Sequence, residues 1–354
     1  MVEIPKEMKR LVVTSPGAGT SVADCKMEIE TVPTPIPKSN EVLIKVAAAP
    51  INPSDYGSWY KSKPESYPMA VGKEGSGTIV ATGGYLTSLR FSVGMNVGFI
   101  CNGGKTGSYS EYVAVNAMTG VFPMPEDVPI EDCASFMVNP YTAVGILDTA
   151  KQSSSSKAIV HTAAASQLGQ MLNKLAIMED MQIINVVRRE EQKQLLEELG
   201  AKHIVVTSSS SAGDDAWKDE LKVKVKELGA SCAFDAVSGD MTGHLLDVMP
   251  AKTGVVYLYG NLAGRAGNID PSNLIYRKKQ LKSFFLTTWI QNGGTMQMVS
   301  RMMNAGKIVN SGLGTGGWCS TQFQDVEMVN AHEEICKALN SSITGKKLRI
   351  RLFY

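Results

Sequence analysis

Several features that mark other classes of protein are missing from this chain of 354 residues. Its six cysteines are scattered, and no two have the C-x-x-C spacing of zinc or redox sites, so we expect reduced, mostly buried thiols. No apolar stretch approaches the roughly 18 residues needed to span a bilayer. The segment MVEIPKEMKRLVV resembles neither a signal peptide nor a transit peptide, which predicts a cytoplasmic location.

An excess of charge of one sign is also lacking. The chain has 35 Lys and Arg against 34 Asp and Glu, a net charge of +1, so there is no electrostatic case for binding nucleic acid or an anionic membrane. We predict neither as a partner. Because a single core rarely grows past roughly 250–300 residues, the length favours two domains.

The first part of the chain consists of short segments typical of β-strands, separated by turns rich in glycine and proline. Closely spaced strands of this kind predict a β-barrel or sandwich. A helical apolar pattern follows at 130–150, and it places the first domain boundary near residue 140. The strand-like segments are EVLIKVAAAP (41–50), GSGTIVAT (75–82), GMNVGFIC (94–101) and SEYVAV (110–115).

The next part alternates between short apolar runs and amphipathic helical segments. Strand, helix, strand in this repeating order predicts an α/β fold with a doubly wound, six-stranded parallel sheet of the kind that binds nucleotides. The predicted strands are AIVHT (158–162), MQIINVV (181–187), HIVVT (203–207), CAFDAV (232–237), GVVYLYG (254–260) and SFFLTTWI (283–290).

A literal G-x-G-x-x-G motif occurs at Gly312, Gly314 and Gly317, but no strand precedes it and no helix opens directly behind it. The required strand-turn-helix context belongs instead to AIVHTAAASQLGQMLNKLA. Small residues stand there in the three glycine places, which permits close approach of the backbone to a pyrophosphate, although an ordinary turn is the alternative. The predicted contacts are Ala164, Ala165, Ser166, Gln167, Leu168 and Gly169.

The end of the second strand of this unit indicates which dinucleotide binds. An enzyme that prefers NAD usually has an acidic residue here, but this chain has Arg188 and Arg189. Guanidinium groups suit a 2′-phosphate, so NADPH is the predicted cofactor. The alternative is that the two arginines only pair with Glu190 and Glu191.

With this organisation, the chain resembles the medium-chain dehydrogenase/reductase superfamily, specifically its zinc-free quinone reductase and 2-enoyl thioester reductase branch. The resemblance implies a GroES-like β-barrel catalytic domain (1–140 and 300–354), a Rossmann domain (141–299) and a homodimer paired through SFFLTTWI. The motifs that carry it are INPSD (51–55), VGKEGSG (71–77), NPYTA (139–143), the TAAASQLGQ turn, INVVRR (184–189), FDAVSG (234–239), LYG (258–260) and SFFLTTW (283–289).

In the zinc-dependent members, metal ligands stand where this chain has Asn52, Lys73 and Asn139. Neither an amide nor an ammonium group is a suitable ligand for tetrahedral Zn²⁺, and Glu74 alone cannot hold the ion. We therefore predict no metal, which argues against an alcohol dehydrogenase.

The resemblance implies transfer of a hydride from NADPH to an activated double bond in an enone, an enal or a 2-enoyl thioester, followed by protonation. Members of the branch use a tyrosine after the NPSD motif as proton donor, which leaves Tyr56, Tyr60 and Tyr67 as candidates, with Tyr60 preferred. Lys73 is hypothesised to hold a substrate carbonyl or a cofactor phosphate. A quinone reductase and an NADPH-binding protein without turnover are the alternative functions.

The resemblance also implies contacts to the cofactor from residues outside the turn. These are Asn52, Asn139, Thr142, Tyr259, Gly260, Phe285, Leu286 and Lys346. For Phe284 a place in the core is expected, and His161 is expected to be a buried histidine with a hydrogen-bond partner rather than a ligand to the cofactor.

Overall fold

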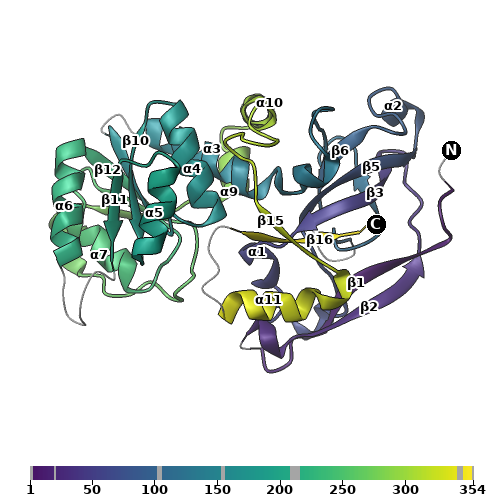
Figure 1. Ribbon diagram of the computed structural model, residues 1–354, viewed down its shortest axis with the longest axis horizontal. Coiled ribbons are helices and arrows are strands. Elements are labelled where there is room, and N and C mark those ends of the chain that lie inside the picture. Colours follow the sequence, from purple (N-terminus) through teal and green to yellow (C-terminus); the bar gives the residue numbers. More distant parts are fainter. Residues whose placement is uncertain are drawn as a thin grey trace. The chain divides into compact units, whose positions relative to one another are not determined.

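The computed structural model of the chain describes residues 3–19, 21–101, 106–152, 156–207, 216–340 and 346–352 (Figure 1). The chain divides into two units. Unit 1 contains Met1–Val138 and Val309–Tyr354, and unit 2 contains Asn139–Ile308. The second boundary falls within helix α10 (Thr295–Asn310), as does the boundary that the sequence predicted at 299/300.

Unit 1 is built on two sheets, so the predicted β-rich first domain is confirmed. One sheet has the order β2-β1-β4, and the other has the order β15-β16-β3-β5-β6-β8, with β7 paired to β3. The strands of unit 1 are β1 (Glu7–Ser15), β2 (Lys26–Pro33), β3 (Glu41–Pro50), β4 (Met69–Ala70), β5 (Glu74–Thr82), β6 (Asn96–Ile100), β7 (Tyr112–Asn116), β8 (Val121–Pro123), β15 (Phe323–Val326) and β16 (Lys347–Arg351).

The C-terminal segment returns to unit 1 because β16 pairs antiparallel with β3, with Ile350 opposite Ala49. Ile350 also packs in a core with Leu11, Trp59 and Tyr109, which joins the two ends of the chain in one hydrophobic cluster. The helices of unit 1 are η1 (Val22–Asp24), α1 (Pro53–Tyr56), η2 (Pro64–Ser66), α2 (Tyr85–Ser88), η3 (Ile130–Ser135), η4 (Met328–Asn330) and α11 (Ala331–Asn340).

Unit 2 is a doubly wound parallel sheet of six strands, as the sequence predicted. The strand order is β11-β10-β9-β12-β13-β14. From β9, the first strand of the unit, the chain adds β10 and β11 on one side and then β12, β13 and β14 on the other, so the order of the strands reverses next to β9. In sheets of this kind, ligands bind beyond the carboxyl ends of the strands at that reversal. The strands are β9 (Ala158–Thr162), β10 (Gln182–Val187), β11 (His203–Val206), β12 (Ala230–Asp235), β13 (Val255–Leu258) and β14 (Gln280–Ser283).

Alternate side chains of these strands fill cores on opposite faces of the sheet. Val186 and Val205 pack with the apolar residues of α6 and α7, whereas Val187 and Val206 pack with Leu196 of α5. Figure 1 shows these helices beside the sheet. The helices that begin in unit 2 or at its boundary are α3 (Val138–Lys151), α4 (Gln167–Met178), α5 (Glu190–Glu198), α6 (Ala216–Leu228), α7 (Asp240–Val248), α8 (Pro271–Ile275), α9 (Leu286–Gln291) and α10.

The predicted strand at 283–290 is wrong. Strand β14 ends at Ser283, and the segment from Leu286 onwards folds as helix α9. A tertiary contact accounts for the difference, because the indole Nε1 of Trp289 donates to Asp148 of α3 at 2.8 Å. At this edge of the sheet the strand is β14 and ends at Ser283, so pairing of two copies through the whole of SFFLTTWI does not fit this structure.

Two further expectations concern cysteines and membranes. All six cysteines are reduced thiols and five are buried, which confirms the prediction made for them. Within the described ranges, no helix combines the length and the apolar character that crossing a bilayer requires.

Candidate cofactor and active site

The predicted cofactor residues of unit 2 gather at the carboxyl edge of the parallel sheet. The turn 163–166 follows β9, Arg188 follows β10, Tyr259 follows β13 and Phe285 comes shortly after β14. Because parallel strands end at one edge, four segments far apart in sequence are brought to the same side of the unit. This is the edge at which a doubly wound sheet holds a dinucleotide.

The turn after β9 has the geometry of a close approach between backbones. A Cβ atom on Gly169 would lie 2.2 Å from the carbonyl oxygen of Ala164, so only glycine fits at this position. Ser166 is the N-cap of α4, and its hydroxyl accepts a hydrogen bond from the backbone N–H of Gly169 at 3.1 Å. Ala163 has a φ of +52°, a conformation that costs an alanine roughly 1–2 kcal/mol. The turn therefore fits a pyrophosphate at the N-terminus of α4.

The two arginines stand where a 2′-phosphate would be expected. Arg188 is exposed directly after β10, and Arg189 is the N-cap residue of α5. Their backbone N–H groups donate to Oε1 of Gln192 at 3.0 and 3.3 Å, and these bonds help to fix the start of the helix. Backbone donors at both positions therefore contribute to the junction.

Sequence reasoning missed the residue that organises this edge, Asp235 at the end of β12. Its Oδ1 accepts from the Thr162 hydroxyl at 2.8 Å and from the backbone N–H groups of Val237 and Ser238, while Oδ2 accepts from Thr242 at 2.9 Å. Four donors satisfy a carboxylate that is fully buried. The signal was present in the FDAVSG motif, but its aspartate was not singled out.

His161 and Tyr259 form a pair at the same edge. The Tyr259 hydroxyl lies 2.6 Å from Nε2 of His161, and the two rings stack with centroids 5.8 Å apart. Burial lowers the pKa of His161 to about 3, so the imidazole is neutral, and burial also raises the pKa of Tyr259. The expectation of a buried, partnered histidine is confirmed, and Tyr259 is held by a group that the sequence did not connect with it.

The remaining predicted residues of unit 2 lie at element ends. Asn139 and Thr142 are in the first turns of α3, where Pro140 is tolerated because that turn needs no intrahelical N–H donors. A Cβ on Gly260 would lie 2.6 Å from the carbonyl oxygen of Ala236, so the ends of β12 and β13 approach closely. Phe284 is buried as expected, whereas Phe285 is 64% exposed and Leu286 begins α9.

In unit 1, Asn52 is the centre of a buried hydrogen-bond network. Its Nδ2 donates to Oε1 of Glu74 at 2.9 Å, and its Oδ1 accepts from Nζ of Lys347 at 2.6 Å. Oε2 of Glu74 accepts from the backbone N–H groups of Met137 and Val138, and Lys347 also donates to the Ser135 hydroxyl at 2.9 Å. Asn52, which the resemblance places at a zinc-ligand position, is thus engaged on both sides of its carboxamide.

Asp55 lies beside this network. Its Oδ2 accepts from the backbone N–H of Asn52 at 2.7 Å and from the hydroxyl of Tyr109 at 3.2 Å, while its Oδ1 has no hydrogen-bond partner among the described residues. Burial raises the pKa of Asp55 to about 6. Burial and the nearby Asp55 also raise the pKa of Tyr109 well above its usual range, so its phenol stays protonated.

The three candidate proton donors have different surroundings. The hydroxyl of Tyr67 donates to the carbonyl oxygen of Trp59 at 2.5 Å. Tyr56 is half-buried, and its burial together with the neighbouring Asp55 raises its pKa to about 12. Tyr60 is partly exposed in the turn after α1, with Nζ of Lys61 5.2 Å from its ring centroid. Tyr60 remains the preferred candidate because the Tyr67 hydroxyl is engaged by the backbone.

The two predicted lysines lie outside the buried network. Lys73 is partly exposed, and its Nζ donates to the carbonyl oxygen of Ser54. Lys346 is exposed just before β16, whereas its neighbour Lys347 is 7% exposed and reaches Asn52. The sequence pointed to Lys346 alone, because two adjacent lysines give no indication of which one a strand buries.

The resemblance predicted that Asn52, Lys73 and Asn139 replace zinc ligands, and Asn52 is engaged by Lys347 and Glu74. Among the described residues, no three His, Cys, Asp or Glu side chains lie close enough to hold a metal ion. The glycine-rich segment 312–317 forms a turn in unit 1, in which the N–H of Gly317 donates to Gly314 and that of Cys319 to Gly312.

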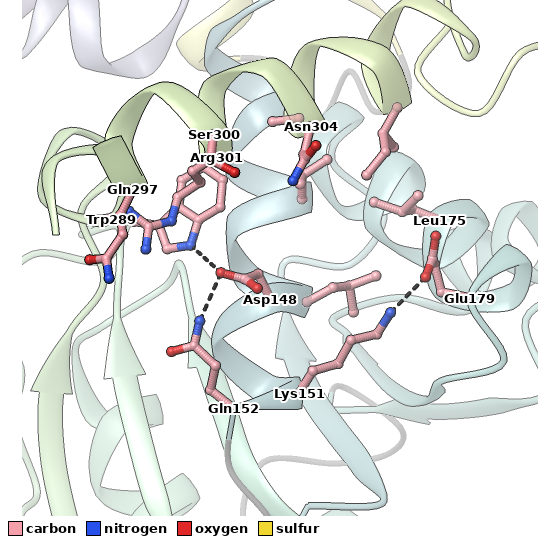
Figure 2. A pocket seen from close by; sticks show the side chains of 14 residues that line it. Asp148, Lys151, Gln152, Leu175, Glu179, Trp289, Gln297, Ser300, Arg301 and Asn304 are labelled. Carbon is pink, nitrogen blue, oxygen red and sulfur yellow. Dashed lines mark hydrogen bonds and ion pairs between the residues drawn. The ribbon is translucent and has the colours of Figure 1, made fainter. Parts of the chain in front are cut away.

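A separate pocket of about 440 Å³ lies in unit 2 among α3, α4, α9 and α10 (Figure 2). Figure 2 shows Asp148 accepting hydrogen bonds from Trp289 and Gln152, and Lys151 paired with Glu179 at 2.6 Å. Trp289 lies in α9 and the other four residues lie at the C-terminal ends of α3 and α4, whereas the turn predicted to bind the cofactor is at the N-terminus of α4. The pocket contains none of the predicted site residues.

Comparison with known proteins identifies the class of this fold and site. The family model described as the alcohol dehydrogenase GroES-like domain matches residues 38–126, and that described as zinc-binding dehydrogenase matches residues 168–316. The mitochondrial enoyl-[acyl-carrier-protein] reductase of Homo sapiens is 26% identical over 328 residues, which cover 89% of this chain and 82% of the relative.

Solved structures give the same class. A putative NADPH:quinone reductase from Mesorhizobium loti has a TM-score of 0.82 and 30% identity, covering 99% of this chain and 100% of that one. The quinone oxidoreductase of Escherichia coli, solved with NADPH, has a TM-score of 0.77 at 16% identity and covers 97% of this chain and 99% of its own, which supports the fold.

The chain therefore belongs to the medium-chain dehydrogenase/reductase superfamily, in its zinc-free quinone reductase and enoyl reductase branch, a class of NADPH-dependent oxidoreductases. The expected fold class, a GroES-like domain with a Rossmann sheet, is confirmed.

Proposed function

We propose that the protein is an NADPH-dependent reductase of activated carbon–carbon double bonds, acting on enones, enals or 2-enoyl thioesters. The observation that carries the proposal is the gathering of a small-residue turn, Gly169 and two arginines at the carboxyl edge of the parallel sheet. The turn offers backbone N–H groups to a pyrophosphate, and the guanidinium groups suit a 2′-phosphate that NAD lacks. NADPH, when bound, would supply a hydride.

The chain's own residues have four tasks in such a reaction. Ala164 to Gly169, Arg188 and Arg189 hold the phosphates. Asn139, Thr142, Tyr259, Gly260, Phe285 and Leu286 are proposed to border the nicotinamide, with Tyr259 oriented by His161. The phenol of Tyr60 gives its proton to the α-carbon of the substrate after the β-carbon has accepted the hydride. Lys73 and Asn52 are proposed as donors to a carbonyl oxygen or, for Lys73, a cofactor phosphate.

The substrate class is taken from the relative named an enoyl-[acyl-carrier-protein] reductase, which is aligned with 89% of this chain. The second candidate is a quinone reductase, which is favoured by the similarity to the M. loti protein named as a putative NADPH:quinone reductase. A quinone needs no positioned proton donor, so a tyrosine variant separates the two candidates. NADPH binding without turnover is the third possibility.

The test measures NADPH oxidation in parallel with a crotonyl thioester, an enone and a quinone, for the wild type and for Tyr60→Phe. We expect turnover of the enone or the thioester, and a fall of roughly 10²–10⁴-fold in kcat for Tyr60→Phe without a change in the affinity for NADPH. Tyr56→Phe and Tyr67→Phe serve as matched variants, since each removes one phenolic hydroxyl from the same part of unit 1.

Turnover of quinones alone, unchanged in Tyr60→Phe, would replace the proposal with the quinone reductase. Tight binding of NADPH without oxidation of any of the three substrates would replace it with a non-catalytic protein. A homodimer and a cytoplasmic location complete the proposed description, although the human relative is named as mitochondrial.

A further inference from the structure

Lys347 is a lysine with an unusual position. It is 7% exposed at the start of β16, and its two hydrogen-bond acceptors are the neutral oxygens of Asn52 and Ser135, at 2.6 and 2.9 Å. Burial lowers its pKa, and the nearby carboxyl groups of Glu74 and Asp55 oppose that change. A buried ammonium group costs stability unless its surroundings compensate for it, so its presence in the interior calls for a reason other than packing.

The contacts of Lys347 and Glu74 determine the orientation of the Asn52 carboxamide. A lysine ammonium only donates, and a carboxylate only accepts. The amide oxygen of Asn52 must therefore face Lys347, and its nitrogen must face Glu74. The two atoms of an asparagine amide often cannot be told apart by shape, but here the chemistry of the neighbours leaves one orientation.

Lys347 and Glu74 form a clamp on the Asn52 carboxamide. Both ends of this clamp are anchored on one short segment, residues 135–138. Glu74 accepts from the backbone N–H groups of Met137 and Val138 at 2.9 and 3.0 Å, and Lys347 donates to Ser135 at the end of η3. The chain of hydrogen bonds thus runs from residue 138 through Glu74, Asn52 and Lys347 back to residue 135. Rotation of the carboxamide would break hydrogen bonds on both sides, so the network holds it rigidly.

An asparagine nitrogen carries two hydrogens, and Glu74 engages one of them. We propose that Lys347 is a positioning residue for the reaction: it locks the Asn52 carboxamide so that the second Nδ2 hydrogen is a donor of fixed direction for a carbonyl oxygen. The Lys347 bond to Oδ1 also polarises the amide and strengthens that donor. The inference rests on the proposed function, and the carbonyl belongs either to the substrate or to the carboxamide of the nicotinamide.

The experiment is a double-mutant cycle of Lys347→Met and Asn52→Ala, with kcat and the dissociation constant of NADPH measured for each variant. Asn52→Ala is expected to lower kcat by about 100-fold and Lys347→Met by about tenfold. Because Lys347 acts through Asn52, the double variant should be no slower than Asn52→Ala. If the two losses multiply, or if Lys347→Met keeps the full kcat, the inference is overturned.

Two further variants separate positioning from a loss of stability. Lys347→Arg keeps a donor-only cation and should recover most of the kcat lost in Lys347→Met. The matched control is Lys279→Met in unit 2, because Lys279 is also buried and its Nζ donates to the carbonyl oxygens of Leu246 and Asp247 at 2.6 and 3.1 Å. Lys279→Met should lower the free energy of unfolding while leaving kcat unchanged. An equal fall of kcat in Lys279→Met would assign the effect to stability instead.

A readout that needs no turnover keeps the inference distinct from the proposed function. In the protein without cofactor, the ¹⁵N–¹H resonances of the Asn52 side chain, assigned with Asn52→Ala, should be shifted in Lys347→Met; unchanged resonances would contradict the clamp. If the clamp is present but no substrate turns over, the proposed function fails instead. A rise in the NADPH dissociation constant in both single variants assigns the carbonyl to the nicotinamide, and an unchanged constant with a reduced kcat assigns it to the substrate.

Discussion

The carboxyl group of Asp55 lies in the interior of unit 1 with one of its oxygens, Oδ1, lacking a partner among the described residues. Burial of the charged form raises its pKa to about 6, above the value of about 3.9 that an aspartate has in an unfolded chain. Between these two values, the folded protein holds a proton that the unfolded chain releases. The contribution of Asp55 to stability therefore grows as the pH falls through 6 and is lost as the pH rises through it.

We expect this dependence to disappear in Asp55→Asn, which cannot titrate. The free energy of unfolding of the wild type, relative to that of the variant, should increase by about 2 kcal/mol between about pH 7 and pH 4.5. Denaturant unfolding of both proteins at the two pH values measures the difference. A difference that stays constant with pH would show that Asp55 does not titrate in this range in the folded state.

Single residues also show where sequence reasoning reached its limit. Asn52 could be singled out because it stands within a recognisable motif. Its partner Lys347, and Ser135 to which Lys347 also donates, could not, because Lys347 is 295 positions from Asn52 and 212 from Ser135. The pairing of β16 with β3 brings Lys347 close to Asn52, and local patterns do not carry that information.

Among the elements, the junction of β10 with α5 bears most directly on the choice of cofactor. In the double variant Arg188→Ala/Arg189→Ala, we expect the dissociation constant of NADPH to rise by roughly 10–100-fold and that of NADH to change little, because hydrogen bonds to charged groups contribute about 1.5–3 kcal/mol. Quenching of protein fluorescence by each dinucleotide measures both constants. An equal loss for the two cofactors would contradict a role in binding the 2′-phosphate.

This double variant should leave the fold of the junction intact. Gln192 at the start of α5 accepts from the backbone N–H groups of both positions, and alanine retains these donors. Arg188→Lys/Arg189→Lys is the matched control, because it retains both charges while removing the fork geometry that binds a phosphate through two hydrogen bonds. It should fall between the wild type and the alanine variant in its preference for NADPH.

Periodicity predicted most elements of unit 2 and failed at one of them. Buried parallel strands such as β9 and β12 read as continuous apolar runs, which a sequence shows directly. The aromatic and β-branched run at 283–290 has the same appearance, yet α9 begins at Leu286. Trp289 bonds to Asp148 and a Cβ on Gly145 would meet its ring at 3.0 Å, so contacts with α3 decide the conformation.

At the scale of the whole molecule, the sequence predicted a first domain built from both ends of the chain around an inserted nucleotide-binding unit. The division of the structure into Met1–Val138 with Val309–Tyr354, and Asn139–Ile308, has this organisation. The sequence pattern was the basis for this prediction, because short apolar runs and helical segments alternate regularly between residues 158 and 283. For the proposed function, the net charge of +1 matters less than the positions of three cationic side chains, Arg188, Arg189 and Lys347.

The central claim is that the protein transfers a hydride from NADPH to the β-carbon of an activated double bond. The most direct measurement uses NADPH deuterated at C4, in each of its two stereoisomers, with a crotonyl thioester or an enone, followed by mass spectrometry and NMR of the product. We predict one deuterium at the β-carbon from one of the two stereoisomers, and a proton from solvent at the α-carbon. A product without deuterium at the β-carbon, or no product from either substrate, would contradict the claim.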